Sequence, residues 1–196
     1  IGLRALSLDL EAERFERFQE GSLGWPFVDA CLRCLAATGW LNFRMRAMLV
    51  SIASYHLWID WRKTGAQMAR WFTDFEAGIH WSQIQMQSGT TGINANRMYS
   101  PVKQSEDQDP NGVFIKRWIP ELSQVPTEWI HQPWRMPLSL QHQVGCRIGS
   151  DYPEPIGDPQ QLAREARSRL KMWIESHDLK PEAQRVLKAH GSRLRQ

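Results

Sequence analysis

A chain of 196 residues is long enough for one sizeable domain, and its composition excludes several classes of protein. The formal net charge of +3 permits a nucleic-acid partner without demanding one, and no apolar run approaches the roughly 20 residues of a membrane span. We therefore expect no membrane partner. The three cysteines lack the spacing of a disulfide framework, which suits a reducing compartment, and a cytoplasmic location is expected.

Tryptophan is the unusual residue of this composition. Ten tryptophans are present, spread from position 25 to position 173. Because the indole ring is large, flat and packs well against other aromatic groups, this content predicts that something flat or redox-active lies among them.

The first part of the chain has the periodicity of helices. Residues 6–20 are rich in helix formers and end at the turn sequence "GSLGWP". A second helix is expected from Pro26, a residue favoured at the first helical position, to the Thr-Gly pair at 38 and 39. From a capping Asn42, apolar residues keep the same period to position 58, which predicts one long buried helix.

The middle of the chain changes from helical to loop-like composition. Thr64 is expected to cap a third helix, which Gly78 ends. Residues 89–112 are dense in Gly, Asn, Ser, Asp and Pro and predict a long ordered loop, a kind of segment that is usually functional.

The last part of the chain predicts a mixture of short and long helices. Residues 111–122 indicate one short helix and residues 126–137 an irregular tract. Residues 158–177 predict an amphipathic helix with Asp158 as its cap, and the tail from 179 forms one more helix or frays. No alternating strand pattern occurs, so the expected fold is all-α.

Most signatures of catalysis or metal binding are missing from the sequence. Cys31 and Cys34 form a CxxC, but their apolar helical context favours buried structural thiols. The six histidines have no ligand spacing, so no metal site is predicted, and no P-loop or GxSxG is present.

Arg46 is the charged residue with the clearest structural implication. It is interleaved with the apolar stripe of its helix, and a buried arginine nearly always has a carboxylate or phosphate partner. Asp74 lies at the end of the next predicted helix, so we expect a buried ion pair. The spacing leaves open whether this pair only ties two helices together or belongs to a binding site.

Four stretches, taken in order, resemble the C-terminal, FAD-binding helical region of the DNA photolyase and cryptochrome superfamily. They are "GWPFVDACLRCLAATGWLNFRMRAMLVS", "LWIDWR", "TDFEAG" and "DPNGVFIKRWIPEL", and the resemblance covers about residues 18–137. It implies an all-α domain that holds a U-shaped FAD in a central cavity. In photolyases, light drives an electron from the reduced flavin into a pyrimidine dimer flipped out of DNA, whereas cryptochromes use the same pocket for signalling.

The resemblance assigns the cofactor-binding residues position by position. Arg46 matches the arginine beside the isoalloxazine, and Asp74 matches its aspartate partner. Glu76 replaces a second flavin-contacting aspartate. His80 occupies the position that faces flavin N5 and tunes its redox states, and Phe43 stands where dimer-repairing enzymes have an asparagine that touches both flavin and lesion.

The same resemblance assigns residues to DNA and to electron transfer. Arg44 lies where the family has a DNA-facing arginine, and Arg97 lies in a loop near the lesion cavity. Trp61 matches the middle tryptophan of the electron-transfer chain, so Trp61 and His80 are the expected catalytic residues.

Three further positions depart from the pattern of dimer-repairing members. Ala47 replaces a lesion-contacting methionine, and Ile84 and Met86 replace two tryptophans near the flavin and the lesion. The usual electron chain is therefore interrupted unless Trp81 or Trp40 substitutes.

The family's upstream phosphate-binding segment and its N-terminal α/β antenna domain have no counterpart in these residues. We therefore expect the C-terminal part of a longer protein, with 1–25 a leading helix and linker, 26–137 the core of the FAD-binding domain and 138–196 a helical extension. On its own the chain should bind FAD weakly or not at all and lack activity.

Three functions of the full-length protein stay open. The first is that of a photolyase, a carbon–carbon lyase that acts on ultraviolet-damaged DNA. The second is that of a blue-light photoreceptor or interaction module without repair activity, and the third is that of a helical scaffold that has lost flavin.

Overall fold

The structure is a computed structural model that describes residues 8–91 and 97–176, with the side chains described from residue 11 onward. These residues form helices and no strand, which confirms the all-α prediction; the only pairing of strand type is an isolated bridge between Ile148 and Tyr152. The α-helices are α1 (Leu8–Glu20), α2 (Pro26–Thr38), α3 (Phe43–Ser51), α4 (Trp61–Trp71), α5 (Ala77–Gln87), α6 (Pro101–Gln108), α7 (Val113–Trp118), α8 (Leu138–Val144) and α9 (Pro159–Ser176). The tail predicted from residue 179 lies outside the described residues.

Helix α2 and the start of α3 agree with the sequence prediction. Helix α2 begins at Pro26 and ends before Gly39, which takes the left-handed conformation (φ 71°) that favours glycine at a helix C-terminus. Asn42 caps α3 as predicted, because its side chain accepts a hydrogen bond from the backbone of Met45 at 3.0 Å.

The long helix predicted from residue 42 to residue 58 is wrong in its second half. Helix α3 stops at Ser51, and residues Ile52–His56 form a π-helix, η1, in which the N–H of Leu57 bonds to the carbonyl of Ile52 at 3.1 Å. Trp58 then adopts φ 57°, a left-handed backbone that L-residues rarely take. Apolar periodicity does not separate α from π geometry, because both helices bury the same residues.

The predicted third helix is also shifted. Asp60, not Thr64, caps α4 by accepting from the N–H of Arg62 at 2.8 Å, and α4 ends at Trp71. Gly78 does not break a helix but lies in the first turn of α5, a helix that the sequence analysis missed.

The predicted loop at 89–112 contains a helix. Ser100 caps α6 by accepting from the N–H of Lys103, and Pro101 occupies its first position. A Ser-Pro pair is therefore a helix start here, although it is equally common in turns. Asp158 caps α9 as predicted, with its Oδ1 2.7 Å from the N–H of Gln161.

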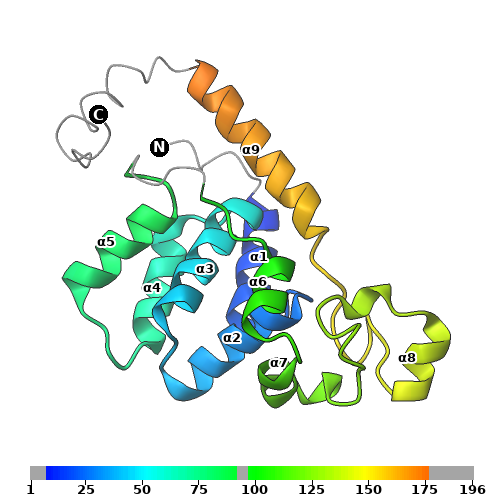
Figure 1. Cartoon of the computed structure of the whole chain (residues 1–196). Coiled ribbons are helices and arrows are strands. Elements are labelled where there is room, and N and C mark those ends of the chain that lie inside the picture. The colour runs from blue at the N-terminus through cyan, green and yellow to red at the C-terminus, as the bar shows by residue number, and fades with distance from the viewer. Residues whose placement is uncertain (1–7, 92–96, 177–196) are drawn as a thin grey trace, which may run out of the picture.

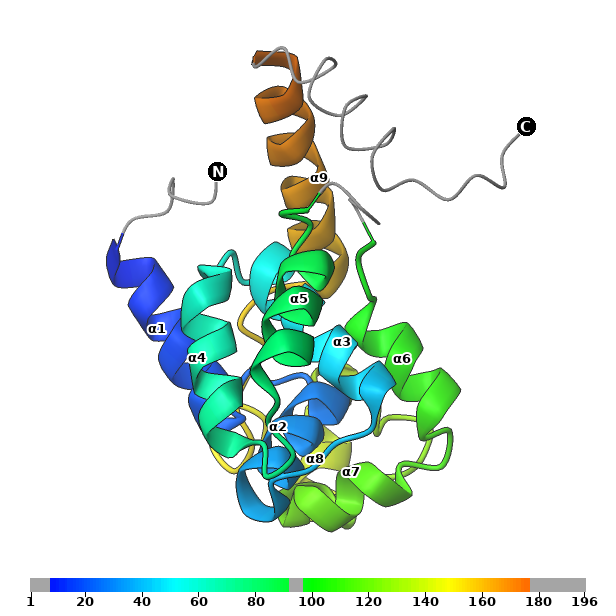
Figure 2. The same cartoon turned by 90° about the vertical axis from the view of Figure 1, so that its left-hand side faces the viewer.

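A small hydrophobic cluster of Tyr55, Trp58 and Ala166 lies where α9 meets the chain at η1, whereas most of the buried apolar side chains form one core centred on α2. This helix contacts α1, α3, α6 and α7, and α4 and α5 lie beside α3 on one side of the bundle (Figure 1). Helix α9 runs along η1 and projects beyond the other helices, as both views show (Figure 2). No helix in the described residues is both long and apolar enough to cross a bilayer.

The chain on either side of α2 is tied to it by Asp29. This fully buried carboxylate accepts from the N–H groups of Leu23 and Gly24 at 2.8 and 2.9 Å and from the hydroxyl of Tyr152 at 2.5 Å. A Cβ on Gly24 would lie 2.4 Å from the carbonyl oxygen of Glu154. Only glycine therefore allows the segment before α2 to lie this close to the segment that contains Glu154. The core thus includes residues from all three predicted domain segments, whose boundaries stay a prediction.

The ionisation of Asp29 makes this tie depend on pH. Its pKa is raised to about 6, because burial disfavours the charged form more than the hydrogen bonds favour it. Between the ordinary value of 3.8 and the folded value, the folded state binds more protons than the unfolded state. The raised pKa of Asp29 therefore contributes its full stabilisation of the folded state at a pH below the ordinary value. This stabilisation is lost as the pH rises through the folded value.

We expect Asp29→Asn, which cannot ionise, to remove this pH dependence. The free energy of unfolding of the wild type minus that of the variant should fall between roughly pH 4 and roughly pH 7, by up to about 3 kcal/mol. Urea unfolding across this range measures it, with Asp107→Asn at an exposed position as the control. A difference that stays constant with pH would contradict the assignment.

Candidate functional site

A groove of about 180 Å³ lies where α3, α4 and α5 meet, and we call it the α3–α5 groove. It collects five residues that the resemblance assigned to cofactor binding and adds apolar and amide side chains from α4 and α5. Its lining residues are Phe43, Arg46, Ala47, Val50, Met68, Phe72, Asp74, Phe75, Glu76, Ile79, His80, Gln83, Ile84 and Gln87.

Arg46 and Asp74 form the predicted ion pair at the edge of this groove. The guanidinium donates two hydrogen bonds to the carboxylate, at 3.0 and 2.7 Å, and its face lies 4.1 Å from the ring centre of Phe72. The hydrogen bond from Arg46 lowers the pKa of Asp74. The prediction that the pair is buried is wrong for Asp74, whose side chain is 48% exposed. The reason is that the turn between α4 and α5, which carries Asp74, lies on the surface.

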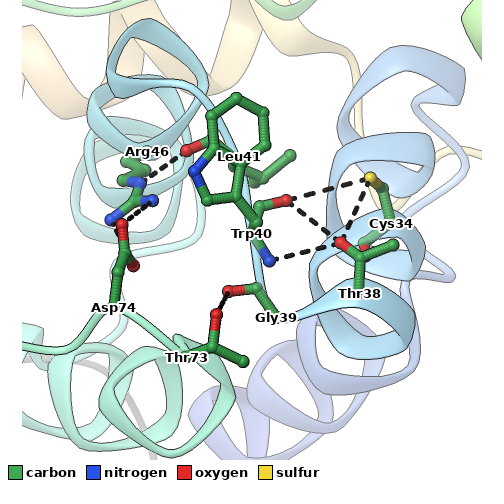
Figure 3. A network of polar contacts seen from close by, with 8 residues as sticks. All are labelled: Cys34, Thr38, Gly39, Trp40, Leu41, Arg46, Thr73 and Asp74. Carbon is green, nitrogen blue, oxygen red and sulfur yellow. Dashed lines mark hydrogen bonds and ion pairs between the residues drawn. The ribbon is translucent and has the colours of Figure 1, made fainter.

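Backbone contacts hold the Arg46 side chain in place (Figure 3). Its Nε donates to the carbonyl of Leu41 at 2.6 Å, and the N–H of Thr73 donates to the carbonyl of Gly39 at 3.0 Å. The bond between Thr73 and Gly39 thereby joins the segment after α4 to the segment before α3, next to the ion pair. This arrangement fixes the position of a cation beside an apolar groove.

Glu76 has a structural task that the sequence analysis did not anticipate. Its two carboxylate oxygens accept from the N–H groups of Gly78 at 3.0 Å and Ile79 at 2.6 Å, so it caps α5. The bonds from Ile79 and Gly78 lower the pKa of Glu76 and keep it anionic at the positive end of the helix.

His80 lines the groove as a neutral, oriented imidazole. Its Nε2 lies 2.9 Å from the carbonyl oxygen of Gly65, and because a carbonyl can only accept, Nε2 carries the proton. Burial lowers the pKa of His80, so the ring stays neutral near neutral pH and Nδ1 keeps its lone pair.

Trp61 is not among the lining residues but connects to them through Trp81. The ring centres of Trp61 and Trp81 are 6.3 Å apart and those of Trp81 and His80 are 5.2 Å apart, both in edge-to-face geometry. A Cβ on Gly65 would lie 2.6 Å from Cζ3 of Trp81, so this glycine allows Trp81 to pack close against α4.

The groove contains lining residues that the sequence analysis did not assign to it. Ile79, Gln83 and Gln87 recur with His80 at helical spacing along α5, but the interpretation of Gly78 as a helix end hid this periodicity. The side-chain oxygen of Gln83 is buried and has no hydrogen-bond partner among the described residues. A groove with an unpartnered acceptor in its wall is suited to a ligand that carries an N–H or O–H donor.

The two predicted DNA-binding residues lie outside the groove. Arg44 is exposed on the first turn of α3, next to lining residue Phe43. Arg97 is exposed, and its guanidinium lies 5.5 Å from the ring centre of Tyr99. The described residues also contain no cluster of three His, Cys, Asp or Glu side chains suited to a metal, and Cys31 and Cys34 are buried free thiols.

The fold and the site define the class of the protein as an all-helical bundle with an aromatic groove, in which one arginine is paired with a carboxylate. The family model described as the FAD binding domain of DNA photolyase matches residues 3–172. The chain belongs to this photolyase and cryptochrome family, as its motifs indicated, and FAD, the expected cofactor, is the one in the family description.

Individual relatives include both photolyases and cryptochromes. The chain is 33% identical to cryptochrome DASH of Gloeobacter violaceus over 93% of its own length, and 34% identical to a deoxyribodipyrimidine photo-lyase of Alkalihalophilus pseudofirmus over 87%. It spans only 37% and 36% of these two relatives. Of solved structures, the class III photolyase of Agrobacterium tumefaciens matches with a TM-score of 0.81 and 26% identity, over 90% of this chain and 37% of that one.

The close contact at Gly65 predicts how the groove responds to an added methyl group. We expect Gly65→Ala to displace Trp81 and to lower the free energy of unfolding by about 1–3 kcal/mol, because overpacking forces neighbouring groups to move. Gly78→Ala is the matched control, since its Cβ would approach nothing closer than 3.4 Å. Urea unfolding and tryptophan emission measure both variants, and equal stability of the two would contradict the contact.

Proposed function

We propose that this chain supplies part of the FAD site of a full-length photolyase or cryptochrome, and that the flavin ring binds in the α3–α5 groove. The observation that carries the proposal is the Arg46–Asp74 pair, held by backbone contacts beside a groove that the neutral His80 also lines.

The residues of the groove fit a flavin ring in their chemistry. Apolar and aromatic side chains suit a flat ring system, Arg46 suits its electron-rich carbonyl edge, and the unpartnered oxygen of Gln83 suits a ring N–H. The volume of about 180 Å³ is below the roughly 300–1,000 Å³ of typical ligand pockets, so these residues hold part of the dinucleotide only. This supports the expectation that the isolated chain binds FAD weakly.

Each proposed residue has a distinct task. When bound, FAD supplies absorption of blue light and one-electron chemistry. Arg46 orients the ring and offsets negative charge, and Asp74 and Glu76 hold Arg46 and α5 in place. His80 offers the lone pair of Nδ1 as a proton acceptor, because its Nε2–H is bound to α4.

Trp81 and Trp61 would carry an electron between the groove and the start of α4. Their edge-to-face contacts form an unbroken aromatic series from His80 to Trp61, whose ring lies 4.8 Å from the guanidinium of Arg62. In this proposal Trp81 has the electron-transfer role of the tryptophan nearest the flavin in relatives, whose position is occupied here by Ile84.

For the full-length protein we propose ultraviolet-damaged DNA as the substrate and repair as the function, with the cytoplasm as its location. The photolyase relatives and the exposed Arg44 beside the groove support this function. A blue-light photoreceptor is the second candidate, favoured by the apolar mouth of the groove, where Phe43 is 61% exposed and Ile79 is 64% exposed. Light-dependent repair of irradiated DNA by the full-length protein separates the two, since a photoreceptor shows the spectral change without turnover.

The ion pair is the part of the FAD site that a single substitution tests. In the full-length protein we expect Asp74→Ala to weaken FAD binding by roughly tenfold, because Arg46 loses the partner that orients it. The cost in folding stability should be small, about 0–1 kcal/mol, since the pair is partly exposed. Titration of flavin fluorescence measures affinity, and Asp107→Ala, which removes the exposed Lys103–Asp107 pair of α6, is the control. Equal FAD affinity of the two variants would exclude this groove.

The aromatic series predicts which tryptophans matter for photoreduction. In the full-length protein, with a thiol as the electron donor, we expect Trp81→Phe and Trp61→Phe each to slow flavin photoreduction to the same rate as the double variant, because the two residues act in series. Trp118→Phe on α7 should leave the rate unchanged. Additive losses in the double variant, or a normal rate in Trp81→Phe, would show that electrons travel elsewhere.

A further inference from the structure

A second cavity, of about 280 Å³, lies between η1 and the beginnings of α6 and α9, and we call it the α9 cavity. It shares no lining residue with the α3–α5 groove. Polar and cationic groups reach it from several separate segments: His56, Tyr99, Ser100, Gln160, Arg164 and Arg167.

The wall formed by η1 is irregular and incompletely hydrogen-bonded. His56 is only 2% exposed, yet its Nδ1 has no hydrogen-bond partner among the described residues, and the same holds for Oγ of Ser54 and Nε1 of Trp58. These three residues lie in or beside the π-helix, and Trp58 has the left-handed backbone. Buried orphan donors, π-helices and strained residues concentrate at functional sites in proteins.

The wall formed by α9 contributes positive charge without a counterion. Arg164 and Arg167 are exposed and form no ion pair with any described carboxylate. The two nearest acids of the helix are occupied, because Asp158 caps the first turn and Glu165 contacts Gln161 and Arg169.

The imidazole in this cavity is a neutral donor rather than a third cation. Burial first, and the positive charge of Arg167 second, lower the pKa of His56 to about 4. A neutral imidazole has one N–H donor and one acceptor, so it can bond to an anion without a proton being taken up.

We propose that the α9 cavity binds a small phosphorylated ligand, whose phosphate lies between Arg164, Arg167 and His56. Guanidinium groups match phosphate oxygens with paired hydrogen bonds, and the buried His56 places a polar partner behind them. The volume approaches that of pockets for small organic ligands, and Met98, Tyr99 and Ala163 line the remainder, so an organic phosphate ester fits better than a bare ion. This site does not depend on the proposed FAD site.

Calorimetric titration with ribose 5-phosphate, and with ribose as its phosphate-free counterpart, tests the site on the chain itself. We expect ribose 5-phosphate to bind and ribose not to bind. Arg167→Gln and Arg164→Gln should each weaken binding roughly tenfold or more, because each removes a charge-assisted hydrogen bond. Lys171→Gln removes the same charge from the same helix, at a residue 3.8 Å from Glu175 and outside the cavity, and should bind as the wild type does.

The outcomes either support the site or overturn it. Titration with inorganic phosphate distinguishes the source: affinity equal to that for the sugar phosphate assigns free phosphate, and weaker affinity assigns an organic ester. Nitrogen NMR of the His56 imidazole should shift on addition of ligand in the wild type, a readout that loss of folding in a variant cannot mimic. Binding of ribose as tight as that of ribose 5-phosphate, no binding at all, or equal loss in Lys171→Gln would each overturn the proposal.

Discussion

The absence of a side chain at Gly65 is the constraint on which the candidate site depends. Without a side chain at Gly65, α5 approaches α4 so closely that Trp81 lies against the α4 backbone. The carbonyl oxygen of Gly65 also accepts the hydrogen bond from His80 at 2.9 Å. Both contacts come from one residue, so the orientation of His80 and the link to Trp61 are set together. The groove exists because α5 is fixed at this distance from α3 and α4, with Glu76 securing its first turn.

Membership of the photolyase and cryptochrome family and the local chemistry explain different parts of the site. The family accounts for the helical scaffold, and the ion pair of Arg46 and Asp74 is a contact within that scaffold. The local chemistry adds the α5 wall of the groove, where the amide side chains of Gln83 and Gln87 lie beside Ile84. Ring contacts through Trp81 connect His80 in this groove to Trp61 at the start of α4.

The two cavities differ in the electrostatics of their walls. In the α3–α5 groove the cation has its own carboxylate, so the site carries little net charge and suits a flat, weakly charged ring. In the α9 cavity Arg164 and Arg167 lack such partners among the described residues, and the buried His56 stays neutral. The first arrangement selects by shape and hydrogen bonding, whereas the second selects by charge.

The sequence by itself determined the helical class, the ends of α2 and the partnership of Arg46 with Asp74, because periodicity, capping residues and a charge within an apolar stripe are local signals. It failed at η1, α5 and α6, where the same residues are compatible with two local structures. Only tertiary packing decides whether Gly78 ends or begins a helix, and whether an apolar stripe continues as α or π. The exposure of Asp74 and the contact of Trp81 with Gly65 likewise depend on how closely separate helices approach, which no local pattern encodes.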